Sequence, residues 1–349
     1  MTRALGRVAA AVAALGVCGL AWAGQAAAQE GPKSPTVDAI KKRGELACGV
    51  DTGIPGFAFQ DNAGRWQGFD IAYCRAIAAA VLGDGDKVRF VPTTAKVRFT
   101  VLQSGEIDVL IRDSTLTFSR DVQLGLSEVA VTLYAGQGFM VRKSLGVGSL
   151  KDLSGATICM LTGATLELNL ADYNKRNGID VHSLLFDKVD EAFQAAETGR
   201  CDGYSDDSGS VAAARSTMKN PADWVILPEL ISKEPLGIHA RDGDEAWNQI
   251  LRWTHYALLS AEEYGVTQAN LEEQKKSATD PAVRRLLGIE GGFGKLLGLD
   301  DEWAYREIKV AGNYGELYDR YFGPQALGLP RGLNKLYRDG GIQYALPFR

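Results

Sequence analysis

The segment from Arg112 to Arg120 contains residue types that together bind small charged molecules. It follows an apolar run at 107–111 that is typical of a short buried strand in a parallel sheet. The segment offers a carboxylate at Asp113, a hydroxyl at Thr115 and a guanidinium group at Arg120. Because open α/β sheets bind ligands beyond the carboxyl ends of their strands, this spacing predicts a binding site.

The chemistry of that site follows from the charges that it can pair. Hydroxyls and a guanidinium group bind a carboxylate, so Thr115 and Arg120 are candidates for one end of a ligand. A second acid, Asp207, occupies a matching place later in the chain and is a candidate for binding an ammonium group. Receptors for both charges predict a zwitterionic ligand, such as a free amino acid.

The place of Asp207 is part of an internal repeat. The sequences Ser-Gly-Glu-Ile-Asp at 104–108 and Thr-Gly-Arg-Cys-Asp at 198–202 each separate a predicted helix from a predicted strand. Asp113 lies eight residues after Gly105, and Asp207 lies eight residues after Gly199. The repeat predicts two lobes of similar design; a common helix-to-strand turn used twice is the simpler alternative.

Two further candidates come from other turns, and each candidate also has a simpler structural role. The turn at 162–165 predicts an anion-binding group at Thr165 in the second lobe, and Phe57 is expected in a wall of the cleft. Arg120 could instead form a surface ion pair with Asp121 or Glu128, and Arg112 could neutralise Asp113. Thr115, Thr165 and Asp207 could each simply cap a helix. The aromatic residues Phe57, Phe59 and Trp66 could pack in the core.

Helical and strand patterns alternate along the chain, which favours an α/β fold with mostly parallel sheets. Predicted helices cover 36–42, 69–82, 96–102 and 166–174, and predicted strands cover 46–50, 88–91, 108–111 and 156–161. A hairpin turn is expected at 61–64, and a capping box variant at 149–152 opens a further helix. The chain is expected to cross between the lobes near 134–142 and again near 228–239. The C-terminal part, 245–349, is predicted to form amphipathic helices that pack on the first lobe.

Length and charge limit the class of protein. The chain has 349 residues, with 38 Lys and Arg against 43 Asp and Glu and a formal net charge of −5. A chain of this length exceeds one ordinary core, so two domains are expected. The mildly acidic balance offers no basic surface for nucleic acid.

Residues 1–28 match a cleavable export signal. A basic start with Arg3 and Arg7 precedes an apolar run at 8–20 and a group of small residues. Cleavage after Ala28 is favoured over cleavage after Ala23, and it changes the formal charge from −5 to −7. A lipid anchor at Cys18 is the alternative. Because no other stretch approaches the ~18 apolar residues of a membrane span, we expect an exported, soluble periplasmic protein.

The number of cysteines is consistent with export to the periplasm. Cleavage leaves four Cys, an even number in an oxidising environment, which predicts two disulfides. Three pairings are possible, and Cys48–Cys74 with Cys159–Cys201 is the economical one because it keeps each bridge within one half of the chain. Four free thiols are the alternative.

Catalytic signatures are sparse, so we expect no enzyme, no metal and no cofactor. The three His (His182, His239 and His255) share no catalytic spacing, and the usual serine-hydrolase, zinc-protease and Cys-x-x-Cys motifs do not occur. The glycines at 291–294 before Lys295 imitate a phosphate loop. A true loop needs Gly at 289 and Ser or Thr at 296, where this chain has Ile289 and Leu296.

Taken together, these features resemble the periplasmic solute-binding proteins of polar amino-acid ABC importers, and more closely the general L-amino-acid-binding type. The resemblance spans nearly all of the chain after the export signal. It rests on Cys48-Gly49-Val50-Asp51, Ile54-Pro55-Gly56-Phe57, Gly64-Arg65-Trp66-Gln67-Gly68-Phe69-Asp70, Gly199-Arg200-Cys201-Asp202 and Tyr318-Asp319-Arg320-Tyr321-Phe322-Gly323-Pro324.

The resemblance implies a two-lobe periplasmic-binding-protein fold of type II, with two hinge crossings and a helical C-terminal extension. Lobe 1 would comprise 36–138 and 235–349, and lobe 2 would comprise 139–234. A monomeric protein would close on L-amino acids of broad specificity and deliver them to an ABC permease and, through it, to its ATPase. By motif, the carboxylate-binding groups fall on Arg120, Thr115 and Thr165, and the ammonium-binding acid falls on Asp207.

The chain departs from the family pattern in places. Ile54 replaces a frequent aromatic residue, Arg112 replaces a usual Gly, Ala or Ser, and Asp113 follows as the acid or amide. These departures favour a broad pocket. The competing hypothesis is an enzyme of the same fold, such as a prephenate- or arogenate-type dehydratase, with Asp113 or Glu167 as its acid. A sensory receptor domain would need a membrane segment and a downstream signalling module.

Overall fold

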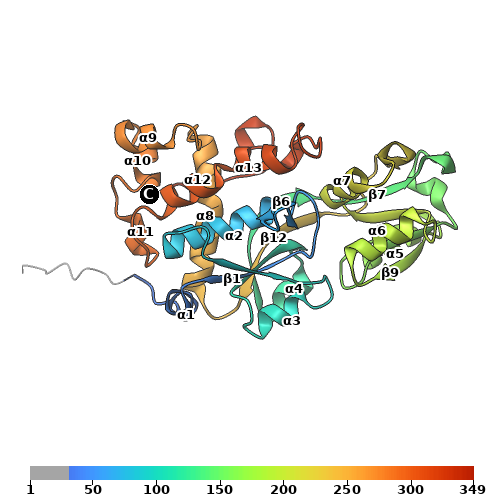
Figure 1. The fold of residues 1–349 in the computed structure, drawn as a ribbon, viewed down its shortest axis with the longest axis horizontal. Coiled ribbons are helices and arrows are strands. Elements are labelled where there is room, and N and C mark those ends of the chain that lie inside the picture. The colour runs from blue at the N-terminus through green and yellow to red at the C-terminus, as the bar shows by residue number, and fades with distance from the viewer. Residues whose placement is uncertain (1–30) are drawn as a thin grey trace, which may run out of the picture.

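The computed structural model describes residues 31–349, so the predicted export signal, its cleavage sites and Cys18 lie outside the described residues. The described chain folds into two lobes joined by extended segments (Figure 1). Each lobe contains one five-stranded mixed sheet with helices around it. The predicted two-lobe α/β architecture is confirmed.

The sheet of the first lobe is assembled from both ends of the described chain. Its strands are β1 (Leu46–Val50), β4 (Val88–Pro92), β5 (Val109–Thr115), β6 (Leu126–Ala135) and β12 (Glu234–Arg241), in the order β4-β1-β5-β12-β6. Strands β4, β1 and β5 run parallel, whereas β12 runs antiparallel to β5 and β6. The helices of this part are α1 (Pro35–Arg43), α2 (Phe69–Leu82), α3 (Arg98–Gln103) and α4 (Phe118–Gln123), and β2 (Phe59–Gln60) pairs with β3 (Trp66–Gln67) in the predicted hairpin.

The second sheet repeats this design over a shorter stretch of chain. Its strands are β7 (Gln137–Arg142), β8 (Thr157–Leu161), β9 (His182–Phe186), β10 (Gly203–Asp207) and β11 (Trp224–Ile226), in the order β11-β7-β10-β8-β9. The helices of this part are α5 (Leu166–Asn177), α6 (Val189–Glu197) and α7 (Ser208–Thr217), with 3-10 turns at Lys143–Leu145, Leu150–Leu153 and Pro221–Asp223. The predicted capping box of Ser149 and Asp152 is present, but it opens a 3-10 turn rather than an α-helix.

Two connections carry the chain between the sheets. The first is Gly136, which separates β6 in the first sheet from β7 in the second. The second is the segment 227–233, which leads from β11 back to β12. Both connections are short and extended, which is the arrangement that lets two lobes rotate as rigid bodies.

The C-terminal part consists of helices, as the sequence predicts. They are α8 (Glu245–Glu263), α9 (Leu271–Ser277), α10 (Pro281–Leu286), α11 (Phe293–Leu296), α12 (Trp303–Ala311) and α13 (Tyr314–Tyr321), followed by 3-10 turns at Gly332–Asn334 and Tyr337–Asp339. Helix α8 packs against β6, and α12 packs against α2. Figure 1 shows α9, α10 and α11 on the side of the first lobe that faces away from the second lobe, and α13 above the first lobe. Within residues 31–349, no helix is both long and apolar enough to cross a membrane.

The predicted elements follow local sequence signals, with one informative exception. Helix α2 is buried along most of its length and ends at Gly83, which adopts the left-handed conformation that glycine permits. Strand β5 extends to Thr115, four residues beyond the predicted end at Ile111. Its polar end remains in the strand because Leu236 of β12 pairs with Thr115. Pairing with β12 therefore keeps the polar residues 112–115 within the sheet, and the apolar pattern of the sequence alone does not predict this extension of the strand.

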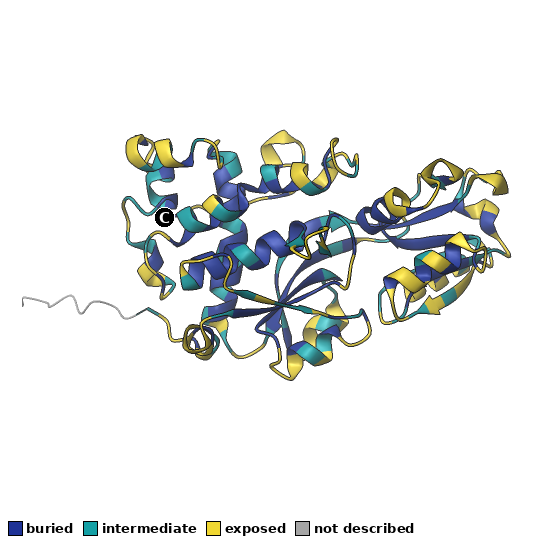
Figure 2. Cartoon of the chain, viewed as in Figure 1, coloured by how far each residue is buried: buried dark blue, intermediate teal, exposed yellow. Residues whose placement is uncertain are grey.

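Burial and disulfides hold each lobe together. Figure 2 shows both sheets as largely buried between helices whose outer faces are exposed. Cys48 of β1 is bonded to Cys74 of α2, with 6.1 Å between their Cα atoms. Cys159 of β8 is bonded to Cys201, just before β10, with 5.6 Å between their Cα atoms. Each bridge therefore ties an inner strand of a sheet to another segment of the same lobe.

Candidate functional site

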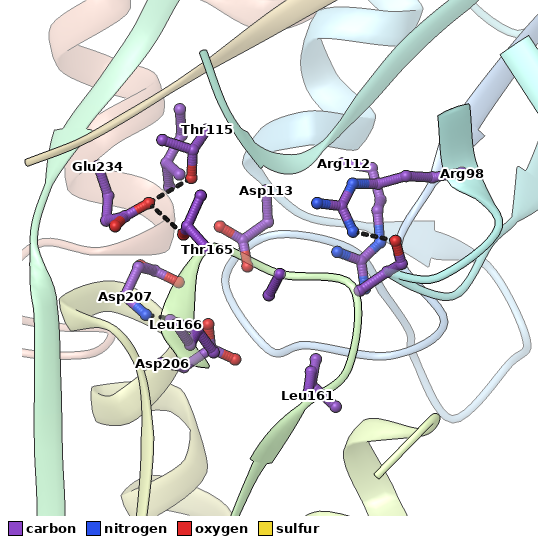
Figure 3. A pocket seen from close by; sticks show the side chains of 13 residues that line it. Arg98, Arg112, Asp113, Thr115, Leu161, Thr165, Leu166, Asp206, Asp207 and Glu234 are labelled. Carbon is purple, nitrogen blue, oxygen red and sulfur yellow. Dashed lines mark hydrogen bonds between the residues drawn. The ribbon is translucent and has the colours of Figure 1, made fainter. Parts of the chain in front are cut away.

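A cavity lies between the two lobes, at the carboxyl ends of β5 and β10 (Figure 3). Four of the predicted site residues line it together: Asp113, Thr115, Thr165 and Asp207. The complete lining is Ala95, Arg98, Arg112, Asp113, Thr115, Leu161, Ala164, Thr165, Leu166, Asp206, Asp207, Glu234 and Leu236. The predicted residues Arg120 and Phe57 are outside this lining. The free volume of about 20 Å³ holds roughly one water molecule, because side chains from both lobes fill most of the space.

Asp113 occupies an unusual backbone conformation at the end of β5. Among residues 31–349 it is the one non-glycine residue with a left-handed φ, at 39°. Its N–H donates to the carboxylate of Asp70 in α2, 3.0 Å away. A left-handed aspartate costs free energy, and such strain persists where the surroundings hold it at a binding site. The conformation turns the Asp113 carboxylate toward the second lobe, where Ser210 donates to its Oδ2 at 2.9 Å.

Three carboxylates meet at this end of the cavity. Asp113, Asp206 and Asp207 each have an oxygen within 4.8 Å of the others. Asp206 is fully satisfied, because the Tyr204 hydroxyl donates to its Oδ2 at 2.5 Å and the Asp207 N–H donates to its Oδ1. Asp113 and Asp207 each keep one buried oxygen, Oδ1 and Oδ2 respectively, without a hydrogen-bond partner among the described residues. Two free carboxylate oxygens form a receptor for a group that carries several N–H donors and a positive charge.

Burial and mutual repulsion change the protonation of this cluster. Burial, followed by the charges of Asp207 and Asp206, raises the pKa of Asp113 well above its ordinary value. Burial and the charge of Asp207 raise the pKa of Asp206 to about 7. Burial also raises the pKa of Asp207, opposed by hydrogen bonds from Ser210 and Gly209. A cationic group placed among these carboxylates relieves the repulsion and favours their ionised forms.

At the other end of the cavity, hydroxyl groups from both lobes converge on one carboxylate. The hydroxyls of Thr115 and Thr165 both donate to Oε2 of Glu234, the latter at 2.9 Å. Oε1 of Glu234 accepts from the Asn169 amide at 2.7 Å and from the Ser232 hydroxyl at 2.6 Å. Figure 3 shows both threonines on the same side of Glu234, with Arg98 and Arg112 across the cavity from it. This cluster of four donors is called the hydroxyl cradle below, and it is built for a carboxylate.

Arg120 lies beside the cradle rather than in the cavity wall. Its Nη1 donates to the carbonyl oxygen of Thr115 at 2.6 Å, and its guanidinium group lies 4.9 Å from the ring centre of Phe99. Burial lowers the pKa of Arg120 to about 10, while the charges of Glu234 and Glu128 raise it, so the group stays protonated at neutral pH. In residues 31–349 it forms no ion pair with Asp121 or Glu128, so the simple surface-pairing alternative is not what the structure shows.

Two further arginines line the cavity that were not predicted as site residues. Arg112 is paired with Asp51 and also donates to the carbonyl of Thr93, so its charge is balanced, and it does not neutralise Asp113 directly. Arg98 is 2% exposed and donates to the carbonyl of Ala95, whereas its Nε has no partner among the described residues. Burial and the neighbouring Arg112 and Arg120 lower the pKa of Arg98. Arginine nevertheless keeps its proton in proteins, so Arg98 carries an unbalanced charge into the cavity.

The structure also resolves the alternative roles of the predicted residues. Asp207 does cap α7, since its Oδ1 accepts from the N–H groups of Gly209 and Ser210, and its other oxygen remains free. The cap of α4 is Thr117 and not Thr115, and Thr165 precedes α5 without a side-chain capping bond. Phe57 packs against Phe322 at 4.8 Å between ring centres. A Cβ on Gly209 would meet the Phe57 ring at 2.8 Å, so Phe57 supports the start of α7 behind Asp207.

Sequence reasoning missed Arg98 and Glu234 for identifiable reasons. Arg98 begins α3, the helix that follows the parallel strand β4 along the chain. The carboxyl end of β4 lies at the same sheet edge as that of β5, a signal that was present but not used. Glu234 begins β12, directly after the second connection between lobes, and is followed by Pro235, which favours an extended backbone at Glu234. Nothing local in the sequence indicates that its carboxylate turns into the cavity.

Comparison with known proteins places this chain in a family. The family model of the bacterial extracellular solute-binding proteins, family 3, matches residues 46–324. The chain is 53% identical over 315 residues to the glutamate/glutamine/aspartate/asparagine-binding protein BztA of Rhodobacter capsulatus, covering 90% of this chain and 93% of that protein. It is 49% identical over 340 residues to the general L-amino acid-binding periplasmic protein AapJ of Rhizobium johnstonii, covering 97% of this chain and 98% of that protein.

A solved structure extends the similarity to three dimensions. A periplasmic binding protein of an ABC transporter from Brucella ovis, determined with glutathione bound, superposes with a TM-score of 0.88 at 49% sequence identity. The match covers 91% of this chain and 100% of that chain. The chain belongs to family 3 of the bacterial extracellular solute-binding proteins, and its two lobes have the type II periplasmic-binding-protein fold.

Proposed function

We propose that this family 3 solute-binding protein captures free L-amino acids in the cleft between its lobes and delivers them to an ABC-type permease. It is a binding protein rather than an enzyme, as its relatives with 53% and 49% identity are named for binding. The dehydratase alternative has little support at the site, because Glu167 is exposed and outside the cavity lining and Asp113 is engaged by Ser210.

One observation carries the proposal: the cavity has receptors for opposite charges at its two ends. The hydroxyls of Thr115 and Thr165, with Arg120 beside them, form the end proposed for the α-carboxylate. The free oxygens of Asp113 and Asp207 form the end proposed for the α-ammonium group. Each end combines groups from both lobes, so a zwitterion of amino-acid size favours the closed arrangement of the lobes.

The strength of these contacts explains a broad specificity. Charge-assisted hydrogen bonds contribute roughly 1.5–3 kcal/mol each. Four such bonds to groups that every amino acid has, reduced by the cost of immobilising the ligand, reach about −8 kcal/mol, which corresponds to a micromolar Kd. Most of the binding energy then comes from the shared backbone charges, which agrees with a relative named for general L-amino-acid binding.

The same proposal assigns the place of action and the arrangement of the chain. Residues 1–28 are proposed as the export signal, and the mature chain as a monomer in the periplasm. Lobe 1 is proposed to comprise 36–138 and 235–349 and lobe 2 139–234, with the permease and, through it, the ATPase as partners. The two changes of sheet, at Gly136 and within 227–233, support hinge crossings close to these boundaries.

The test of this proposal is calorimetry of the mature protein with each of the twenty amino acids. We expect Asp207→Ala and Arg120→Ala each to weaken every amino acid that binds, by about tenfold or more for the loss of one charge-assisted contact. Asp86→Ala and Arg65→Ala, which change exposed residues outside the cavity lining, are the matched controls and should leave affinity unchanged.

Two results would contradict the proposal. If none of the twenty amino acids binds the folded wild-type protein, the proposed ligand class is wrong. If the losses in Asp207→Ala and Arg120→Ala depend strongly on the ligand side chain, the shared backbone charges are not the main anchor.

A further inference from the structure

Glu234 has a place that the proposed function does not explain. It is 2% exposed, begins β12 at the end of the second connection between the lobes, and lines the ligand cavity. Its carboxylate accepts from all four groups of the hydroxyl cradle, two at each oxygen. The cradle proposed for the ligand carboxylate is thus occupied by a carboxylate of the protein.

A hydroxyl group has one proton and donates one hydrogen bond at a time. Thr115 and Thr165 both give theirs to Oε2 of Glu234. They cannot serve a ligand carboxylate while Glu234 holds them. The free volume of about 20 Å³ leads to the same conclusion, because one water molecule fits beside Glu234 and an amino acid does not.

The bonds of Glu234 also connect the two lobes. Thr115 is at the end of β5 in the first sheet, whereas Thr165 and Asn169 belong to the start of α5 beside the second sheet. Ser232 lies in the connecting segment itself, two residues before Glu234. A single side chain therefore joins the first lobe, the second lobe and the hinge segment through one carboxylate.

We propose that Glu234 is a built-in substitute for the ligand carboxylate, which holds the lobes together when the cleft contains no amino acid and is displaced when one binds. This inference rests on the proposed function. The ligand carboxylate takes over the hydroxyls of Thr115 and Thr165, and Glu234 withdraws along the hinge segment. Binding is then an exchange of one carboxylate for another, so Glu234 lowers the net affinity and sets how far the ligand-free protein is closed.

The decisive variant is Glu234→Gln, which keeps the size of the side chain and removes its charge. A neutral amide accepts hydrogen bonds roughly half as strongly as a carboxylate, so it is a weaker competitor for the cradle. We expect the Kd for the bound amino acids to fall by about tenfold relative to wild type. Glu234→Ala removes all four bonds, and we expect its ligand-free radius of gyration in small-angle X-ray scattering to exceed that of wild type.

The matched control is Glu128→Gln. The charge of Glu128 also raises the pKa of Arg120, and its carboxylate accepts from the N–H of Thr117, but it accepts from none of the four groups of the cradle. We expect its amino-acid affinity to stay within about twofold of wild type because the charge is partly screened at its half-buried position. An equal gain in Glu128→Gln and Glu234→Gln would show that removal of any nearby negative charge suffices, and it would overturn the displacement of Glu234.

The remaining outcomes also decide the inference. An unchanged or weaker affinity in folded Glu234→Gln overturns it, because Glu234 would then support the ligand-bound state. An equal radius of gyration for ligand-free wild type and Glu234→Ala overturns the closing role. If Glu234→Ala does not fold, the glutamine variant still decides the competition. Absence of any amino-acid binding by wild type would instead overturn the proposed function, and the inference with it.

Discussion

At the residue scale, the most specific feature of the cavity is the buried charge of Arg98. Its guanidinium group lines the cavity without an acidic partner among residues 31–349, and Nε has no hydrogen-bond acceptor. A buried charge is stabilised when an opposite charge or a strong acceptor reaches it. A ligand side chain that ends in a carboxylate or an amide supplies such an acceptor.

We therefore predict that Arg98→Gln changes the ranking of ligands. Glutamate and aspartate should lose about ten- to hundredfold in affinity, the value of one charge-assisted contact, and apolar amino acids should lose much less. Calorimetry with glutamate, glutamine and leucine measures the difference, with the hairpin variant Arg65→Gln as control. An equal loss of affinity for all three ligands would show that Arg98 supports the structure of the site and does not recognise the ligand side chain.

The three carboxylates predict a pH dependence of binding. Burial raises the pKa of Asp206 to about 7 and raises that of Asp113, so the cluster retains protons near neutral pH. The ligand ammonium group favours the ionised carboxylates, and binding therefore releases protons. Affinity should rise as the pH increases from 6 to 8. Calorimetry in buffers of different ionisation enthalpy measures the released protons, and Asp207→Asn should flatten the dependence; an affinity that falls over this range would contradict the assignment.

At the scale of elements, the site depends on the ends of β5 and β10 staying fixed in their sheets. The disulfide between Cys159 and Cys201 joins β8 to the chain just before β10, and it closes a loop with a sequence separation of 42 residues. The disulfide between Cys48 and Cys74 joins β1 to α2, whose Asp70 holds the backbone of Asp113. The two bridges thus support the elements that carry the acidic end of the cavity.

We predict that the double variant Cys159→Ala/Cys201→Ala lowers the free energy of unfolding by about 2–5 kcal/mol, the usual effect of removing a native disulfide. Urea unfolding followed by fluorescence measures the change, and wild type treated with a reductant is the comparison. Binding at saturating ligand should persist, because neither Cys is in the cavity lining. Loss of binding in a folded variant would show that the bridge positions Asp207 directly.

At the scale of the whole molecule, the proposed function couples ligand binding to lobe closure. Both ends of the cavity use groups from both lobes, and Ser210 and Glu234 already connect the lobes across it. A ligand that binds the folded state alone stabilises it by mass action. Because the hinge segments are short, closure changes the distance between the lobes more than the shape of either lobe.

This predicts a stabilisation that all bound amino acids share. At a ligand concentration of one hundred times the Kd, the free energy of unfolding should rise by about 2.7 kcal/mol. A thermal-shift panel of the twenty amino acids measures it, and D-isomers of the bound amino acids serve as controls because inversion at Cα misplaces one of the two charges. An equal rise in unfolding temperature with D- and L-isomers would show that the cavity does not distinguish the arrangement of the carboxylate and ammonium groups around Cα.

The sequence by itself determined the elements and much of the chemistry. Strand and helix periods, glycine at helix ends and the repeated spacing to Asp113 and Asp207 are local signals, and they predicted the two-lobe fold and the acidic end of the cavity. Thr115 and Thr165 were predicted for the same reason, since each follows the end of an apolar strand pattern. Such signals can be recognised in the sequence because each depends only on residues that are close together along the chain.

Only the tertiary structure decided which side chains line the cavity and with which groups each of them forms hydrogen bonds. It placed Arg120 beside the cradle, brought Arg98 and Glu234 into the lining, and gave Asp207 a capping bond together with a free oxygen. Glu234 meets Thr115 across a sequence separation of 119 residues. Such contacts depend on how two sheets pack and on where a connecting segment crosses between them, and no local pattern in the sequence encodes that geometry.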